Sequence, residues 1–204
     1  MGRQGWLEIL EAVALSIVAV ATAWSGYQAA KWDALSAKNY SMALHANVDA
    51  QTKAALAGQD RLFDIVTFNG WVAARLAEND KLTAFYERRF RPEYATAFAA
   101  WQKLDPLHNP AAPPGPIFMP EYTSAIAHES ERLSHEGAEY FEKGVSTRET
   151  GDDYVKVTVF LATVLLLTAL SQRFQVKGPR IAVLVVALIL LSVSSYWIAT
   201  FPRA

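Results

Sequence analysis

Three long apolar runs restrict the possible folds of this chain more than any other feature of its sequence. The runs cover residues 7–30, 155–171 and 181–201. A helix needs about 20 mostly apolar residues to cross a bilayer, so the first and third runs are long enough and the second falls slightly short. The connector from Arg173 to Arg180 is only eight residues long, which suits a hairpin. We therefore expect three membrane-spanning helices, one in residues 1–31 and two in residues 154–204.

The first apolar run has a second possible interpretation. Arg3, an apolar core and the small residues Ala21 and Ala23 resemble a secretory signal with its cleavage site. Glu8 and Glu11 do not fit the basic first part of such a signal. We therefore expect an uncleaved membrane anchor.

Basic residues indicate how the three spans are oriented. Arg3 precedes the first run, and the connector between the second and third runs carries Arg173, Lys177 and Arg180 but no acidic residue. The positive-inside rule places both segments in the cytoplasm. Residues 32–153 and the C-terminus are then expected outside, in the periplasm of a bacterium with two membranes or outside the cell otherwise.

Residues 32–153 are acidic, with 12 lysines and arginines against 18 aspartates and glutamates, a formal charge of −6. This charge argues against binding to nucleic acid. The chain has no cysteine, so disulfides and thiol chemistry are excluded.

Apolar residues between 32 and 153 recur at helical spacing, and no alternating strand pattern interrupts them. We expect an all-α fold in which rods at about 31–57, 60–78, 80–104 and 121–153 form an up-down-up-down four-helix bundle. The first and last rods would extend the first two spans. Gly58 is expected to end the first rod, Asp60 to cap the second and Pro92 to lie at a kink or first helical turn.

Glycines recur every seven residues on the last rod, at Gly137, Gly144 and Gly151. Each costs up to about 1 kcal/mol of helix stability relative to alanine. A glycine stripe lets another helix approach closely, and the first rod offers a thin alanine-rich surface. Close packing of these two rods is our interpretation, with a loosened helix as the alternative.

His45, Glu131 and His135 are the weak candidates for a metal site, because carboxylates and imidazoles on neighbouring helices can bind metals. The Glu-x-x-His spacing of di-iron bundles is absent, so a solvated charged face is the simpler interpretation. No nucleophile elbow, phosphate-binding loop, dinucleotide fingerprint or zinc-protease motif occurs. We expect no enzyme activity, no metal and no other cofactor.

Glu8 and Glu11 lie three residues apart near the start of the first span. Carboxylates inside a membrane often mark ion or proton paths. The simpler interpretation is that both lie at the membrane interface or pair with a basic residue of the 173–180 connector.

Arg88, Arg89 and Arg91 lie among aromatic residues in YERRFRPEY. They suggest either an anion or base-stacking site or, more simply, salt bridges to the last rod. The candidate partners on that rod are Glu139, Glu142 and Glu149.

Six of the nine prolines lie in residues 104–122, LDPLHNPAAPPGPIFMPEY. A flexible linker does not suit this segment, because its apolar residues would stay in water. A ligand for an intracellular polyproline-binding domain does not suit a segment outside the cell. We expect residues 105–120 to form a folded cap whose tip is a possible docking site. The tip residues are Leu107, His108, Ile117, Phe118 and Met119.

The stretches RFRPEYATAFAAW and LDPLHNPAAPPGPIFMPEY resemble a pattern in uncharacterised bacterial inner-membrane proteins. That family looks like one anchor helix, a helical outer segment and a terminal pair of spans. The resemblance is specific only over about residues 85–122. It implies a bacterial inner-membrane setting and nothing about activity.

These features favour a non-catalytic membrane protein that assembles through its outer segment, with copies of itself or as an accessory subunit of a larger membrane complex. A ligand-sensing module is the first alternative, with a pocket near Trp71, Trp101 and His135. An oligomeric ion channel that uses Glu8 and Glu11 is the second.

Overall fold

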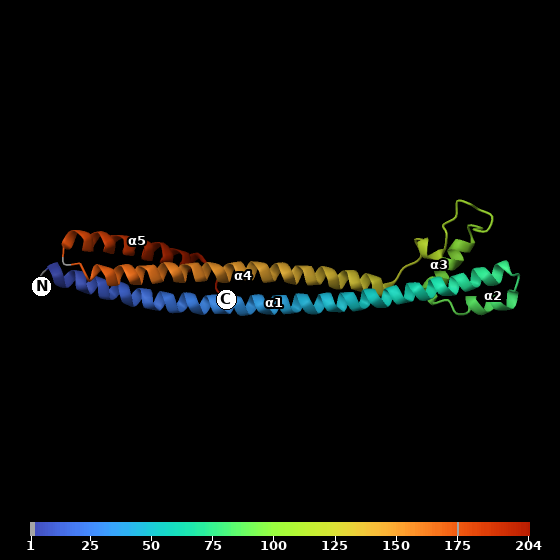
Figure 1. Cartoon of the computed structure of the whole chain (residues 1–204), viewed down its shortest axis with the longest axis horizontal. Coiled ribbons are helices and arrows are strands. Elements are labelled where there is room, and N and C mark those ends of the chain that lie inside the picture. The colour runs from blue at the N-terminus through green and yellow to red at the C-terminus, as the bar shows by residue number, and fades with distance from the viewer. Residues whose placement is uncertain (1–2, 175) are drawn as a thin grey trace. The chain divides into compact units, whose positions relative to one another are not determined.

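The computed structural model describes the backbone of residues 3–174 and 176–204, and the side chains of residues 9, 11–174 and 176–204. The chain is all-α (Figure 1). Within the described residues, its elements are α1 (Arg3–Leu76), α2 (Asp80–Glu87), α3 (Pro92–Gln102), the short 3₁₀ helix η1 (Pro116–Phe118), α4 (Ala125–Ser171) and α5 (Lys177–Thr200). Helices α1, α4 and α5 are long and apolar enough to cross a membrane. The all-α class and the three candidate spans are therefore confirmed.

The predicted break at Gly58 is wrong, because α1 continues through it as one helix of 74 residues. A glycine inside a helix costs about 1 kcal/mol, which the neighbouring helix-forming residues and the contacts of α1 outweigh. The rods predicted at 31–57 and 60–78 are therefore parts of one helix. The rod predicted at 80–104 is divided into α2 and α3. The up-down-up-down bundle of four separate rods is thus incorrect.

Local capping signals set the other helix ends. Asn79 caps α2, since its side-chain oxygen accepts a hydrogen bond of 3.1 Å from the backbone amide of Leu82. Pro92 is the first residue of α3, where its missing amide hydrogen costs nothing. Helix α4 starts at Ala125 rather than at residue 121, and the Ser124 hydroxyl accepts from the amide of Ala127 at 3.2 Å.

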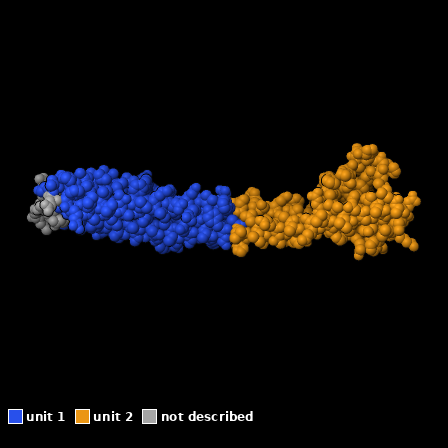
Figure 2. Space-filling view, viewed as in Figure 1, with its two compact units in different colours: residues 1–43, 139–204 blue, residues 44–138 orange. Residues whose placement is uncertain are grey.

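The chain forms two compact units (Figure 2). Unit 1 contains residues 1–43 and 139–204, and unit 2 contains residues 44–138. In unit 1, α4 packs against α1 and α5 through an apolar core that includes Val18, Leu161 and Ala187. This core joins the three candidate spans into one body.

The chain end after α5 is hydrogen-bonded to α1 and α4 within unit 1. The carbonyl of Pro202 accepts from Trp32 Nε1 at 3.3 Å and from the Tyr154 hydroxyl at 3.1 Å. The amide of Ala204 donates to the buried side chain of Gln28 at 3.0 Å. The C-terminus therefore lies beside residues 28–32 of α1.

Two of the three periodic glycines allow close helix approach. A Cβ atom at Gly144, in unit 1, would lie 2.7 Å from the Tyr40 ring, and one at Gly137, in unit 2, would lie 2.9 Å from Asn47. Gly151 is less constrained, because the atom nearest to a Cβ added there would be 3.4 Å away. Close packing therefore applies to Gly137 and Gly144.

Replacing Gly144 with leucine is expected to lower the free energy of unfolding by about 1–3 kcal/mol, because the new side chain overlaps the Tyr40 ring. Thermal unfolding followed by far-UV circular dichroism would measure the loss. The matched control is Gly58→Leu, since a Cβ at Gly58 meets nothing within 4 Å. Equal stability of the two variants would contradict close packing at Gly144.

Candidate functional site

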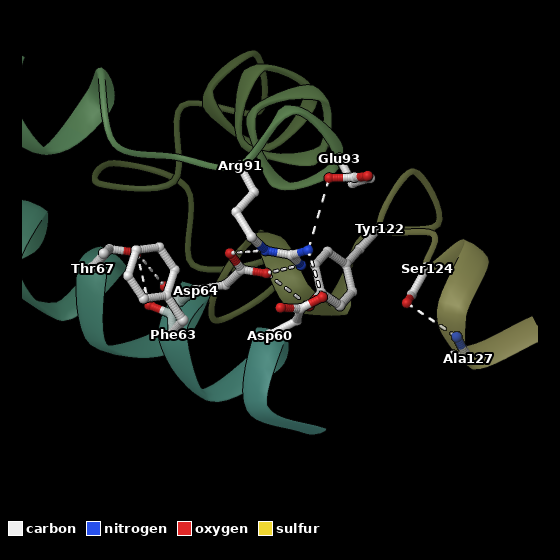
Figure 3. Close-up of polar contacts among 9 residues, drawn as sticks. All are labelled: Asp60, Phe63, Asp64, Thr67, Arg91, Glu93, Tyr122, Ser124 and Ala127. Carbon is white, nitrogen blue, oxygen red and sulfur yellow. Dashed lines mark hydrogen bonds and ion pairs between the residues drawn. The ribbon is translucent and has the colours of Figure 1, made fainter. Parts of the chain in front are cut away.

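The most extensive side-chain hydrogen-bond network of unit 2 surrounds Arg91, between α2 and α3 (Figure 3). Arg91 has extended backbone geometry, as expected for a residue that precedes a proline. Its Nε and Nη2 atoms donate to the two carboxylate oxygens of Asp64 at 3.1 and 2.7 Å. Its Nη1 atom donates to Asp60 at 2.9 Å. The two aspartates lie four residues apart, on one face of α1.

Tyr122, which precedes α4, completes the network by donating its hydroxyl to Asp64 at 2.9 Å. Asp64 therefore accepts three hydrogen bonds, and its side chain is fully buried, with 0% exposed. We call Asp60, Asp64, Arg91 and Tyr122 the Arg91 cluster. It joins three segments that lie far apart in the sequence.

Arg91 and Tyr122 of the Arg91 cluster both hold their protons more tightly than usual. The hydrogen bond to Asp64 raises the pKa of Arg91 above its usual value. Burial raises the pKa of Tyr122 to about 12, and the hydrogen bond to Asp64 adds to this rise. At pH 7 the cluster thus holds a guanidinium cation and a neutral phenol. Its polar groups bind each other, which makes it a structural centre and a poor acid, base or nucleophile.

A cluster of aromatic rings packs beside these residues, with Trp71, Tyr94, Phe98 and Trp101 at its centre. The rings of Trp71 and Phe98 meet edge to face, with centroids 4.9 Å apart. Trp71 Nε1 donates to Glu87 at 2.9 Å, so the polar atom of this side chain is satisfied. These rings are the large apolar side chains that are buried in unit 2.

The proline-rich segment is folded against the aromatic cluster. Trp101 Nε1 donates to the carbonyl of Pro113 at 2.7 Å, and Pro116 is buried. Ile117 and Met119 pack against the cluster. Two of the five predicted tip residues therefore face inwards. The other three, Leu107, His108 and Phe118, are exposed.

Trp71 and Trp101 also line a cavity of about 450 Å³. Arg75, Glu87 and Asp105 contribute charged groups to its wall. His135, which the sequence suggested as a third lining residue, is not among the residues around it. The cavity combines aromatic rings with both signs of charge.

The predicted metal candidates do not form a cluster. In the part of the chain that the structure describes, no group of three or more histidines and carboxylates is placed to hold a metal ion. His45 is exposed on α1, and His135 is exposed on α4. Glu131 lies 3.7 Å from Nδ1 of His128, with both side chains in solvent.

The structure describes the side chain of Glu11 but not that of Glu8, the other acidic residue of the first candidate span. Glu8 belongs to α1, but its side chain lies outside the described residues. Glu11, in unit 1, is 2% exposed and accepts from Arg180 through Nε at 3.0 Å and Nη2 at 2.8 Å. The Ser171 hydroxyl adds a third hydrogen bond at 3.2 Å. Arg180 is one of the connector residues that the sequence offered as partners.

Sequence reasoning missed the partners of Arg91, which it placed on the last rod at Glu139, Glu142 and Glu149. The structure instead pairs Arg91 with aspartates of α1. One signal was available, because Asp64 lies between the apolar residues Phe63 and Ile65. A carboxylate in such a place often has a buried partner.

Comparison with known proteins gives no match: no protein-family model, curated protein or solved structure is similar to this chain. The resemblance to uncharacterised bacterial membrane proteins stays a prediction. The function of the chain must therefore be inferred from the geometry of the molecule.

Tyr122 gives unit 2 a dependence on alkaline pH. Its pKa is about 12 in the folded chain and about 10 in an unfolded one, so the folded state holds this proton more tightly. The resulting stability is fully present below pH 10 and is lost as the pH rises through 12. We expect Tyr122→Phe to weaken the fall in melting temperature between pH 10 and 12. An unchanged fall would show that Tyr122 does not titrate in this way.

Proposed function

We propose that this chain is a non-catalytic integral membrane protein that acts by assembly through its extracytoplasmic helical part. The observation that supports this proposal is the contrast within unit 2. The polar side chains of the Arg91 cluster bind each other. In contrast, large apolar side chains of α1, such as Leu62 and Val66, are exposed to solvent. Exposed apolar patches of this kind commonly mark contacts with other proteins.

The proposed setting is a bacterial inner membrane, with the N-terminus in the cytoplasm and both residues 32–153 and the C-terminus outside. The hydrogen bonds of unit 1 support this topology. Glu11 pairs with Arg180, and both lie at the ends proposed to be cytoplasmic. Ala204 binds Gln28, and both lie at the ends proposed to be outside. The lipid bilayer is then the first partner of the chain, and a protein is the second.

The test is purification of the full chain from its native membranes in a mild detergent. Light scattering would give the mass of the particle, and mass spectrometry would identify proteins that elute with it. We expect either several copies of the chain or a complex with a second membrane protein. A lone monomer without any other protein would overturn the assembly function.

A ligand-sensing module is the second candidate, and the cavity beside Trp71 and Trp101 is the observation that favours it. Aromatic walls with charges of both signs suit a small amine or amino acid. A screen of such compounds would raise the melting temperature of the chain if one binds there. Asp105→Asn should remove that rise, because it deletes one wall charge and asparagine tolerates the positive φ of 47°. No shift with any compound would count against sensing.

A further inference from the structure

A second cavity of unit 2 has walls from α1 and from the segment that leads into α4. Its volume is about 410 Å³, which is typical of a small-molecule site. Helix α1 contributes Ala57, Gly58 and Arg61 to its wall. We call this space the Arg61 cavity.

The charged and titratable groups of the wall are basic. Arg61 contributes a guanidinium and His128 contributes an imidazole, whereas no aspartate or glutamate is among the described residues that line the cavity. Glu131 lies 3.7 Å from Nδ1 of His128, but it is exposed and is not part of the wall. This composition contrasts with the formal charge of −6 of residues 32–153. The wall therefore favours an anion over a cation.

The fold does not use the charge of Arg61. The carboxylates nearest to it along α1 belong to Asp60 and Asp64, and Figure 3 shows that both bind Arg91 instead. Within the described residues, Arg61 takes part in no ion pair. Its guanidinium is thus available to a ligand, and this group binds carboxylates and phosphates through two parallel hydrogen bonds.

Two hydroxyl groups add hydrogen-bond donors to the same wall. They belong to Thr123 and Ser124. Ser124 Oγ accepts from the amide of Ala127 at 3.2 Å, but in the described part of the chain neither hydroxyl donates to a protein acceptor. A hydroxyl can donate one hydrogen bond, and anionic oxygens are strong acceptors. The wall therefore offers one cation and two free donors.

Gly58 keeps the Arg61 cavity open. It lies inside α1, where a glycine destabilises the helix relative to alanine. Close helix packing does not explain it, since a Cβ added there would meet nothing within 4 Å. Arg61 follows three residues later, on the same side of the helix. A larger side chain at position 58 would therefore occupy space beside the guanidinium.

We propose that the Arg61 cavity binds a small organic anion, whose carboxylate or phosphate group pairs with Arg61 and accepts from the two hydroxyls. One water molecule takes up roughly 30 Å³, so an anionic group by itself does not fill the cavity. The apolar body of the ligand packs on Ala57, Ala127 and the ring of Tyr122, whose hydroxyl is held by Asp64. This inference goes beyond the proposed assembly function and does not rest on it.

Calorimetric titration of the full chain in a mild detergent tests the ligand class, with phenyl phosphate and benzoate as probes. Inorganic phosphate has the charge without the apolar body, and benzylamine has the ring with the opposite charge. We expect both organic anions to bind and benzylamine not to bind. Inorganic phosphate should bind at least about ten times more weakly than phenyl phosphate, because burial of the ring adds to the affinity.

Two variants of the wall test the location. Arg61→Gln removes the charge and should weaken the binding of phenyl phosphate at least about tenfold. Gly58→Leu fills the cavity and should abolish binding, while its melting temperature stays equal to that of the natural chain or rises. Arg88→Gln is the matched control, since Arg88 is an exposed arginine of unit 2 that does not line this cavity. It should bind phenyl phosphate as tightly as the natural chain.

Binding of the organic anions that both wall variants weaken, and that Arg88→Gln does not, supports the inference. Binding that Arg61→Gln and Gly58→Leu leave unchanged takes place elsewhere and overturns it. Inorganic phosphate that binds as tightly as phenyl phosphate overturns the organic ligand, and no binding of either organic anion overturns the site. These results do not depend on whether the chain is purified alone or in a complex, so the assembly function is tested separately.

Discussion

Replacing Asp64 with alanine is expected to lower the free energy of unfolding of unit 2 by about 3–5 kcal/mol, the usual cost of removing one partner of a buried ion pair. The loss is large because Asp64 is fully buried and accepts three hydrogen bonds. Without it, the guanidinium of Arg91 keeps only Asp60 and the more distant Glu93. The hydroxyl of Tyr122 loses its acceptor as well.

Hydrogen exchange read by mass spectrometry would measure this loss in unit 2 separately from unit 1. The amides of α3 that exchange by global opening of unit 2 should exchange at least about 100 times faster in Asp64→Ala, since 1.4 kcal/mol corresponds to a factor of ten. Glu93→Ala is the control, because Glu93 is exposed and 3.8 Å from Arg91. An Asp64→Ala chain as protected as this control would show that the Arg91 cluster does not hold unit 2 together.

Replacing Glu11 with leucine is expected to destabilise unit 1 by about 3–5 kcal/mol, because Arg180 then keeps its charge in a largely buried place without this carboxylate. The double variant Glu11→Leu with Arg180→Leu should regain most of this loss. Two apolar side chains suit the surroundings at least as well as a desolvated ion pair. Thermal unfolding in detergent of both single variants and the double variant would give the coupling energy between the residues.

The same position distinguishes a structural role for Glu11 from an ion path. If the pair only stabilises unit 1, replacing Glu8 and Glu11 with glutamine should leave ion flux through liposomes unchanged. Additive losses in the thermal cycle would contradict structural pairing. Flux that falls with these variants would favour the channel alternative.

Signals that act over a few residues were readable in the sequence. The apolar runs predicted the three candidate spans, and Pro92 lies in a first helical turn, which was one of the two places expected for it. Each depends on the chemistry of neighbouring residues. The predicted helix end at Gly58 was wrong, because a single glycine destabilises a helix only weakly. The other residues of α1 outweigh this effect.

Contacts between distant segments were readable only in part, since the connector was offered as a partner of Glu11 but the partners of Arg91 were not predicted. The arginine-rich stretch predicted ion pairs, but the identity of the partner depended on which helix face lies beside residue 91. Several carboxylates of the last rod lay at suitable distances along the chain, and Asp64 was not among the predicted partners. The cap was predicted from its proline and apolar content, whereas the inward direction of Ile117 and Met119 depended on the rings that lie beneath them.

The sequence by itself determined that this chain is helical, that three of its helices are able to cross a membrane, and that residues 32–153 are acidic and without cysteine. These properties follow from composition and local spacing. The tertiary structure decided that Asp64 binds Arg91 and Tyr122, that Glu11 binds Arg180, and which face of α1 stays exposed. The physical reason is that burial and ion pairing depend on how far apart two groups are in space, and sequence spacing fixes that distance only within a single helix.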